Sequence, residues 1–199
     1  MKAVALLSAG MDSPVAIYLM LRKGFEVVPI HFVNGERENY TENVLAISGK
    51  LKKYGLRELI FAKHSGNLEN FKGNRHTCIL CKRMMFRISE RTAEQENAEA
   101  LITGESVSSK ASQTLENMRT ISSVCRIRII RPLLGFSKPD VERISRKLGI
   151  LPDVSEQCAF APSSPRTLCS IEEIEGIEKN YDLEVLAKKS LESMNKCFI

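Results

Sequence analysis

The segment LLSAGMDSPVA, residues 6–16, has the composition of a phosphate-binding loop. An apolar run leads into a glycine and then a helix start, where unpaired backbone N–H groups and the helix dipole attract an anion. Gly10 lets the backbone approach a phosphate closely, and the hydroxyls of Ser8 and Ser13 can donate to it. Asp12 would repel a phosphate directly, so we expect it to act through Mg²⁺ or as a helix N-cap.

This loop has no lysine at the position from which a Walker A lysine contacts the β- and γ-phosphates. Transfer of the γ-phosphoryl group is therefore disfavoured. Cleavage between the α- and β-phosphates of ATP, with pyrophosphate leaving, fits better. The alternative interpretation is a strand-to-helix turn with ordinary capping residues.

Cys78 and Cys81 form a CxxC pair at an expected helix start, where the helix dipole should lower the pKa of both thiols. Such a pair suits a redox dithiol, half of a zinc site, or two ligands of an iron–sulfur cluster. A thioredoxin-like dithiol belongs near the first strand–helix junction of a different fold. A zinc knuckle needs a second CxxC or a histidine pair, and none is evident. Reduced thiols without a ligand remain the alternative.

The elements that must position these residues alternate between strand and helix. Apolar runs predict buried strands at 3–8, 26–33, 58–63, 99–104 and 127–134. Helical periodicity predicts helices at 12–23, at 40–55 with Thr41 as N-cap and Gly55 as stop, at 81–96 and at 137–149. This alternation predicts an α/β fold, a doubly wound, Rossmann-like parallel sheet of about five strands with helices on both faces.

Residues 153–167 are rich in Pro and Ser and should form a loop, and two polar helices should follow Ile171. We therefore expect a nucleotide-binding domain over residues 1–170 and a helical extension over 171–199, packed on the same domain. His31 and Phe32, at the end of the second strand, lie where this fold places adenine. His31 is expected to pack or to meet the adenine edge, not to act as a base.

Composition sets broad limits on partners and compartment. The 199 residues carry a formal net charge of +5, with 43% hydrophobic residues and six cysteines. That basic excess permits a nucleic-acid partner without requiring one. No apolar run reaches the length of a membrane span and no leader segment is evident, so we expect a cytoplasmic protein without a membrane partner. A reducing compartment favours metal-binding or catalytic cysteines over disulfides.

Four stretches together resemble the PP-loop domain of the ThiI-type 4-thiouridine synthetases. The segment 8–13, SAGMDS, is similar to the SGGxDS signature of PP-loop ATP pyrophosphatases, with Ala9 in place of the first glycine. Residues 78–94, 100–121 and 129–150 contain KRMM, TGES, SQTLEN and RPL in that family's order and spacing. The resemblance runs from residue 3 to about residue 165 and implies an adenine nucleotide alpha hydrolase type of fold.

The resemblance implies a sulfurtransferase that acts on tRNA. ATP would adenylate a uridine carbonyl oxygen, pyrophosphate would leave, and a sulfur nucleophile would displace AMP, giving 4-thiouridine. The catalytic residues implied are Asp12, Lys82 at the α-phosphate, and Cys158. The nucleotide-binding residues implied are Ser8, Ala9, Gly10, Asp12, Ser13, His31, Phe32, Gly104, Glu105 and Gln113, with Arg83 as a secondary phosphate contact.

Two basic features leave alternatives open. Arg83, Arg87 and Arg91 recur every four residues and could form an exposed helix face or a stripe that meets an RNA backbone. The relatives usually place a ferredoxin-like and a THUMP domain ahead of the PP-loop domain, whereas here Met1 leads directly into the first strand. We expect a stand-alone form, also without a rhodanese module. RNA contacts would then come from the domain's basic surface, a homodimer or a separate RNA-binding protein.

The resemblance also gives the cysteines a role. Cys158 stands in EQCAFAP, where the family carries its sulfur-transferring cysteine, and members with both this residue and the CxxC pair are the iron–sulfur-dependent kind. Three ligands, Cys78, Cys81 and Cys158, would leave one iron open to sulfide. The sulfur donor would be sulfide or a persulfide carrier. A disulfide or a zinc site are the alternatives for this trio. Cys125 should be core, Cys169 a resolving thiol or spare ligand, and Cys197 has no evident role.

Two rival functions remain on the sequence alone. One is a PP-loop enzyme that adenylates a small-molecule acceptor for amidation or sulfur transfer, as the NAD⁺ and GMP synthetases do with ammonia. The other is a non-catalytic ATP-binding sensor module of the universal-stress type, which shares the fold class.

Overall fold

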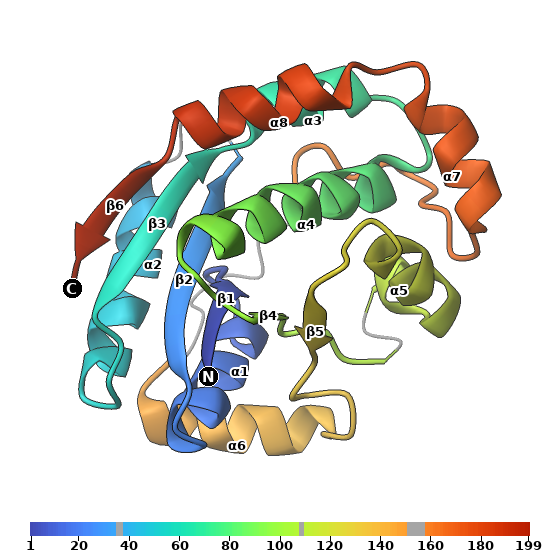
Figure 1. Cartoon of the computed structure of the whole chain (residues 1–199). Coiled ribbons are helices and arrows are strands. Elements are labelled where there is room, and N and C mark those ends of the chain that lie inside the picture. The colour runs from blue at the N-terminus through green and yellow to red at the C-terminus, as the bar shows by residue number, and fades with distance from the viewer. Residues whose placement is uncertain (35–37, 108–109, 151–157) are drawn as a thin grey trace.

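A computed structural model describes residues 1–34, 38–107, 110–150 and 158–199. In these residues a six-stranded sheet lies between two layers of helices (Figure 1). The strands are β1 (Lys2–Leu6), β2 (Glu26–Val33), β3 (Glu58–Lys63), β4 (Ala100–Ile102), β5 (Arg128–Ile130) and β6 (Asn195–Phe198). The helices are α1 (Asp12–Arg22), α2 (Glu38–Lys52), α3 (Ser65–Phe71), α4 (Thr77–Gln95), α5 (Leu115–Ser122), α6 (Lys138–Leu148), α7 (Ile171–Glu178) and α8 (Leu183–Glu192), with a short 3₁₀ turn η1 (Ala111–Gln113).

The strand order is β5-β4-β1-β2-β3-β6. The first five strands pair in parallel, and β6 pairs antiparallel with β3. The order reverses direction at β1, because the chain moves outward to β2 and β3 and then returns to β4 on the other side. In a sheet of this kind ligands bind at the carboxyl ends of the strands beside that reversal. The segments after β1 and β4 are therefore the ones that should form the site.

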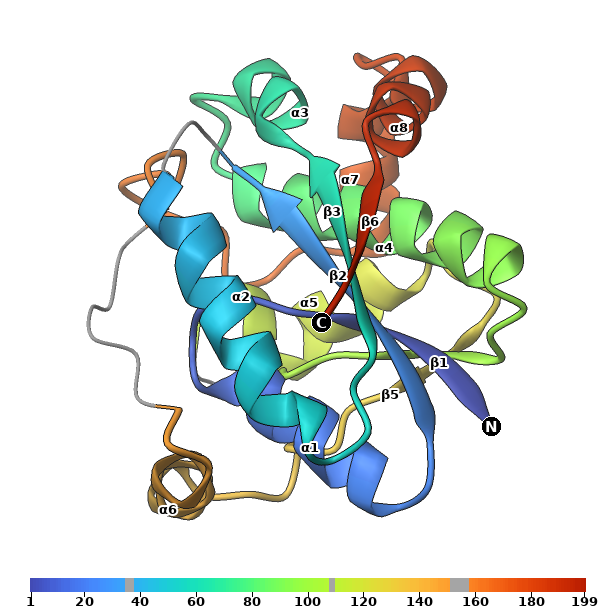
Figure 2. The same ribbon diagram turned by 90° about the vertical axis from the view of Figure 1, so that its left-hand side faces the viewer.

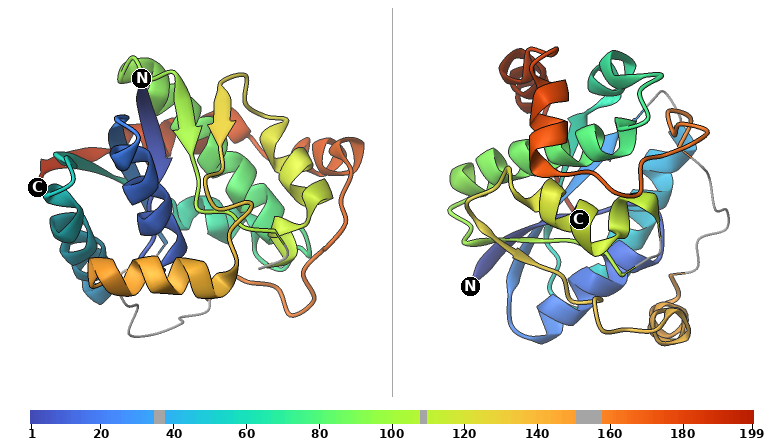
Figure 3. Two further views of the ribbon diagram at one scale, coloured as in Figure 1. Left: turned by 90° about the horizontal axis from the view of Figure 1, so that it is seen from below. Right: turned by 90° about the vertical axis from the view of Figure 1, so that its right-hand side faces the viewer.

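Each face of the sheet has its own hydrophobic core. One core joins Ala3, Ala5 and Leu7 to side chains of α1, α2 and α6, and the other joins Val4 to side chains of α4, α5, α7 and α8. Alternate residues of β1 point to opposite faces, as the two-residue period of a strand requires. Figures 2 and 3 show α1, α2 and α6 on one side of the sheet and α4, α7 and α8 on the other.

The predicted doubly wound parallel sheet is confirmed, with differences at its edges. β6 was not predicted, because NKCF has no alternating apolar pattern and is a strand only through its pairing with β3. Helices α3 and α5 were also not predicted. Helix α2 begins at Glu38, so the expectation that Thr41 is its N-cap is wrong. Helix α4 begins at Thr77 instead of 81, which places both cysteines of the CxxC pair inside its first turns.

Helix α6 follows the sequence signals closely. The Ser137 hydroxyl accepts a hydrogen bond from the Asp140 N–H, Pro139 occupies the first turn, and Gly149 ends the helix in the left-handed region at φ 68°. A serine N-cap contributes about 1 kcal/mol to helix stability. Residues 158–167 of the expected loop are without helix or strand, whereas 153–157 lie outside the described residues. Within the described part of the chain, no helix is long and apolar enough to cross a bilayer.

Candidate functional site

The loop after β1 is braced by its two serines. The Ser8 N–H donates to Oγ of Ser13 at 2.8 Å, and the two Oγ atoms lie 3.0 Å apart. The Ser13 hydroxyl therefore bridges the two ends of the loop that contains Ala9 and Gly10, in addition to any hydrogen bond that it makes to a ligand. Asp12 is the first residue of α1 and not its N-cap, which is Met11. The Asp12 carboxylate lies 3.3 Å from Nζ of Lys138, at the start of α6.

Gly104, which follows β4, packs directly against the backbone at the start of α1. A Cβ atom at Gly104 would lie 2.5 Å from the backbone nitrogen and 2.6 Å from Cα of Ser13. Backbone atoms cannot withdraw as a flexible side chain can, so this position excludes every residue with a side chain. The predicted nucleotide residues Ser13 and Gly104 thus meet in space, although 91 positions separate them in the sequence.

Glu105 gathers cations beside that contact. Its Oε1 lies 2.6 Å from Nζ of Lys82, and its Oε2 lies 2.8 Å from Nε of Arg131 and accepts a hydrogen bond from Thr103 Oγ1 at 3.2 Å. Burial alone would raise the pKa of Glu105, but the charges of Lys82 and Arg131 outweigh it and lower that pKa. Glu105 is therefore an ionised carboxylate. Its role is to hold Lys82 at the edge of the sheet.

Arg131 is a site residue that the sequence reasoning missed. It stands in the RPL stretch that helped to mark the family resemblance, so a signal was present, but the arginine itself was not singled out. Its guanidinium also donates from Nη2 to the Ser122 hydroxyl at 2.7 Å. Arg131 and Lys82 together place two positive charges around one buried carboxylate.

Arg83 is buried in an ion pair, which corrects the expectation that it contacts phosphate. Its side chain is 1% exposed, and Nε and Nη2 each lie 2.8 Å from one carboxylate oxygen of Glu178 on α7. Arg87 forms a second bidentate pair with the same carboxylate at 2.7 and 2.8 Å. Arg91 pairs with Glu184 of α8. The four-residue repeat therefore faces the C-terminal helices, an arrangement for which the sequence held no signal.

The expected adenine residues are mostly packing groups. His31 is buried, and its Nδ1–H donates to the Leu7 carbonyl at 2.9 Å, which ties β2 to the loop after β1. Burial lowers the pKa of His31, and this hydrogen bond opposes the effect. Phe32 is buried against the ring of His64, with centroids 5.4 Å apart. Gln113 is 7% exposed, and its Oε1 has no hydrogen-bond partner among the described residues.

Cys78, Cys81 and Cys158, hereafter the cysteine trio, influence one another electrostatically. Burial raises the pKa of Cys78 and Cys81, and a negative charge on Cys158 raises both further, while Lys82 lowers both. The expectation that the helix dipole would leave these thiols with lowered pKa values is therefore wrong, because burial in the first turns of α4 dominates. Cys158 itself is exposed. Lys82, whose charge acts on Cys78 and Cys81, is also the partner of Glu105, the residue that follows Gly104.

A buried histidine, His64, contacts Cys81 of the trio. Nε2 of His64 lies 3.3 Å from Sγ of Cys81, and Nδ1 of His64 lies 3.0 Å from Nδ2 of Asn67, which also donates to Ser190 Oγ at 2.9 Å. Since Nδ1 accepts from the amide, the proton of the neutral ring is on Nε2 and points at the sulfur. Burial lowers the pKa of His64 to about 3, which keeps the ring neutral. Sequence reasoning missed His64, because it follows β3 as an isolated polar residue.

Similarity to known proteins assigns the chain to a family. A family model described as Thiamine biosynthesis protein (ThiI) matches residues 1–183. The chain belongs to the ThiI family. A probable tRNA sulfurtransferase of Thermococcus kodakarensis is 39% identical over 190 residues, which cover 88% of this chain and 49% of that protein. One of Methanocaldococcus jannaschii is 32% identical over 195 residues, covering 92% and 50%. The chain thus spans about half the length of these ThiI relatives.

A solved 4-thiouridine synthetase–RNA complex with bound ATP has the same fold. It superposes with a TM-score of 0.93 at 33% identity, over 100% of this chain and 55% of the other. NMN synthetase from Francisella tularensis superposes with a TM-score of 0.59 at 14% identity, which shows likeness of fold alone. The predicted resemblance to the ThiI type, drawn from the spacing of short motifs, is confirmed by the match along most of the chain.

Proposed function

We propose that this chain is the adenylating and sulfur-transferring part of a tRNA 4-thiouridine synthetase. One observation carries the proposal. Lys82 lies 2.6 Å from Glu105, beside the nucleotide loop, and the charge of the same lysine acts on Cys78 and Cys81. These contacts support a site in which an ATP-activating loop and thiols act together, as a reaction requires that activates an acceptor with ATP and then delivers sulfur to it.

The nucleotide end follows from the fold. The start of α1 offers backbone N–H groups and the positive end of a helix dipole to phosphates. Asp12 would hold Mg²⁺ there, because its side chain is 27% exposed and its partner Lys138 is a surface residue. Lys82 would stabilise the negative charge that develops on the α-phosphate. Gln113, whose amide oxygen is buried without a partner in the described residues, would accept a hydrogen bond from the nucleotide.

The chemistry balances with sulfide as the sulfur source. The uridine carbonyl oxygen attacks the α-phosphorus, the bond to the bridging oxygen breaks, and pyrophosphate leaves with the electron pair while the ring N–H gives up its proton. Hydrosulfide then adds to the carbon that carries the adenylated oxygen. AMP leaves with the electron pair of the carbon–oxygen bond, and the proton of the hydrosulfide restores the ring N–H. The net reaction consumes ATP, uridine and hydrosulfide and needs no oxidant or reductant.

The cysteine trio fits an iron–sulfur cluster by its donor set. Three cysteine thiolates are ligands of the type that iron–sulfur clusters take, and three of them would leave one iron without a protein ligand. When bound, a cluster held by Cys78, Cys81 and Cys158 would supply an iron position that accepts sulfide.

The protein's own groups would tune that site. The raised pKa values of Cys78 and Cys81 mean that a bound cation must displace their protons. Lys82 and the Nε2–H of His64 both favour the thiolate form. Cys158, exposed on the loop after α6, would be the member that meets the activated uridine.

The decisive experiment measures two products with the same preparation. Anaerobically purified and iron–sulfide-reconstituted protein would be incubated with ATP, Mg²⁺, unmodified tRNA and sulfide, with pyrophosphate measured by a coupled assay and 4-thiouridine by mass spectrometry of tRNA digests. We expect both products. Lys82→Ala should abolish pyrophosphate release, whereas Lys188→Ala, at an exposed lysine of α8, should leave it unchanged.

Each rival function gives a different pattern. Pyrophosphate release that depends on a small acceptor and ammonia, with no thiolation of tRNA, would favour a small-molecule adenylating enzyme. ATP binding without pyrophosphate release under any of these conditions would favour a sensor module. Either result would overturn the proposal.

A further inference from the structure

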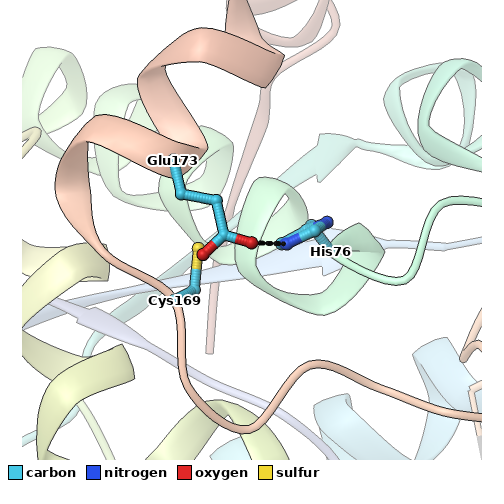
Figure 4. A group of neighbouring side chains, drawn as sticks. All are labelled: His76, Cys169 and Glu173. Atoms are coloured by element: carbon cyan, nitrogen blue, oxygen red, sulfur yellow. Dashed lines mark hydrogen bonds and ion pairs between the residues drawn. The ribbon is translucent and has the colours of Figure 1, made fainter.

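A second cluster of potential ligands contains none of the cysteine trio. His76, Cys169 and Glu173 each offer one ligand atom, and these atoms all lie within 4.8 Å of one another (Figure 4). His76 directly precedes α4, and Glu173 stands in the first turn of α7. Cys169 lies in the segment between Cys158 and α7. Residues more than 90 positions apart thus converge where two helices begin.

His76 is oriented as a metal-binding histidine would be. Its Nδ1 lies 3.0 Å from the carbonyl oxygen Oδ1 of Asn74, which can only accept, so Nδ1 carries the ring proton. Its Nε2 lies 2.9 Å from Oε1 of Glu173. Nε2 is therefore the ring nitrogen that faces the cluster. Metal-binding histidines in proteins almost always donate their other ring N–H to an oxygen in this way.

The sulfur of Cys169 completes a mixed donor set. Cys169 is fully buried, and its side chain points to the same carboxylate as His76 does (Figure 4). Burial and the neighbouring Glu173 charge raise the pKa of Cys169 to about 11. A cation bound beside the thiol would displace its proton and neutralise both negative groups.

Two cationic side chains face the cluster. Nε of Arg166 lies 3.3 Å from Oε1 of Glu173 and forms an ion pair with it. The charge of Arg83 reaches Cys169, but its guanidinium is bound to Glu178. Arg166 is therefore the one of these two that competes with a bound metal for the Glu173 carboxylate.

We propose that His76, Cys169 and Glu173 bind one Zn²⁺ ion, with water as a fourth ligand. A site of one nitrogen, one sulfur and one oxygen suits this borderline-soft ion. Its position gives it a structural role. The Arg166 N–H donates to the Arg75 carbonyl at 3.1 Å, so the segment after Cys158 already pairs with the chain just before α4. A metal there would fix the Cys158 segment to the helix that carries the CxxC pair.

The test uses the full 199-residue chain, stripped of metal under anaerobic conditions, and does not depend on activity. Zn²⁺ affinity would be measured by competition with a chromophoric chelator, and Co²⁺ would report a thiolate ligand through its sulfur-to-cobalt charge-transfer absorption. The variants are Cys169→Ser and Glu173→Gln. The matched control is Cys78→Ser/Cys81→Ser, which removes thiols of the trio and keeps the proposed ligands.

We expect wild type and the control to bind one Zn²⁺ with similar affinity and to show the cobalt–thiolate band. Cys169→Ser should lose the band and bind at least about 100-fold more weakly, and Glu173→Gln should weaken binding by about 10-fold or more. Arg166→Gln should bind several-fold more tightly, because the competing cation is gone. Zn²⁺ should raise the Tm of wild type and control but not of Cys169→Ser.

Two results would overturn the proposal. One is Zn²⁺ binding that Cys78→Ser/Cys81→Ser abolishes and Cys169→Ser leaves unchanged, which would assign the metal to the trio. The other is no binding tighter than micromolar by wild type, which would leave His76, Cys169 and Glu173 as a hydrogen-bonded cluster. If Cys169→Ser fails to fold, the cobalt band of wild type and of the control still decides between these outcomes.

Discussion

Nε2 of His64, the residue after β3, lies 3.3 Å from Sγ of Cys81 in α4. The ring is neutral and donates its proton to the sulfur, because Asn67 supplies a hydrogen to the other ring nitrogen. A hydrogen bond to a thiolate stabilises the charged form. His64 is therefore placed to favour the form of Cys81 that binds a metal or attacks an electrophile.

We expect His64→Leu to slow alkylation of Cys81 by iodoacetamide several-fold at fixed pH in the cluster-free protein, because the thiolate loses its donor. Mass spectrometry would follow each cysteine separately, with Cys197 of β6 as the internal reference. Ser190→Ala is the matched control, since it removes the other partner of Asn67 and leaves the histidine in place. An unchanged ratio of Cys81 to Cys197 labelling would show that the hydrogen bond has no effect on the thiol.

Gly104→Ala should destroy ATP binding. The new methyl group would lie 2.5 Å from the Ser13 nitrogen, so either α1 or the end of β4 must move. We expect an increase of at least about 100-fold in the Kd for ATP, measured by calorimetry, and a lower Tm. Gly49→Ala is the control, because nothing lies within 4 Å of its added Cβ, and it should stabilise α2 by about 0.5–1 kcal/mol. Normal ATP affinity in Gly104→Ala would mean that this contact does not shape the loop.

Asp12→Ala should abolish pyrophosphate release and leave the fold intact. The residue lies at the start of α1 with a partly exposed side chain, and its ion pair with Lys138 lies at the surface, so it contributes at most about 1 kcal/mol to stability. Lys138→Ala breaks the same pair and should retain release, which separates loss of the ion pair from loss of a Mg²⁺ ligand. Circular dichroism and Tm would confirm folding. A folded Asp12→Ala protein with normal turnover would remove Asp12 from the reaction.

Glu178→Gln should lower the free energy of unfolding by about 3–5 kcal/mol at pH 7, because it leaves the buried Arg83 charge without a counter-ion. Burial alone would raise the pKa of Glu178, but hydrogen bonds from Arg83 and Arg87 lower it below its ordinary 4.5. The stabilisation is thus fully present above pH 4.5 and is lost as pH falls through the lowered pKa. The difference between wild type and variant should shrink in urea unfolding at acid pH.

Glu184→Gln is the comparison for that measurement. Glu184 pairs with Arg91 at the surface, with side chains 77% and 34% exposed, so its removal should change the unfolding free energy by less than about 1 kcal/mol. Equal effects of the two variants would contradict the assignment of Glu178 as the centre of a buried network.

The chain alone should bind tRNA weakly, and its affinity should fall steeply with salt, because Lys and Arg contacts to phosphate release counter-ions. Arg83, Arg87 and Arg91 are paired with Glu178 and Glu184, so we expect none of them to contact RNA. Arg91→Gln should leave the slope of log Kd against log salt unchanged in filter binding. A decrease of about one in that slope would place Arg91 on the RNA surface. Tight, sequence-selective binding at physiological salt would contradict the whole expectation.

The sequence by itself determined the parallel sheet, most of its strands and the family. Those features depend on local patterns, namely apolar runs of strand length, caps such as Ser137 and Gly149, and short motifs in a fixed order. It also marked Gly104 and Lys82 as nucleotide-site residues. Local patterns suffice for these features, because each pattern depends on a few consecutive residues.

Only the tertiary structure decided which partners the charged and polar residues take. Arg83 stands next to Lys82 in the sequence, yet one reaches Glu105 and the other is buried against Glu178. His76 and Glu173 are 97 positions apart and lie 2.9 Å from each other. β6 is a strand only because β3 offers it an edge. Such pairings depend on which elements the sheet order brings together, and no local pattern in a single sequence records that order.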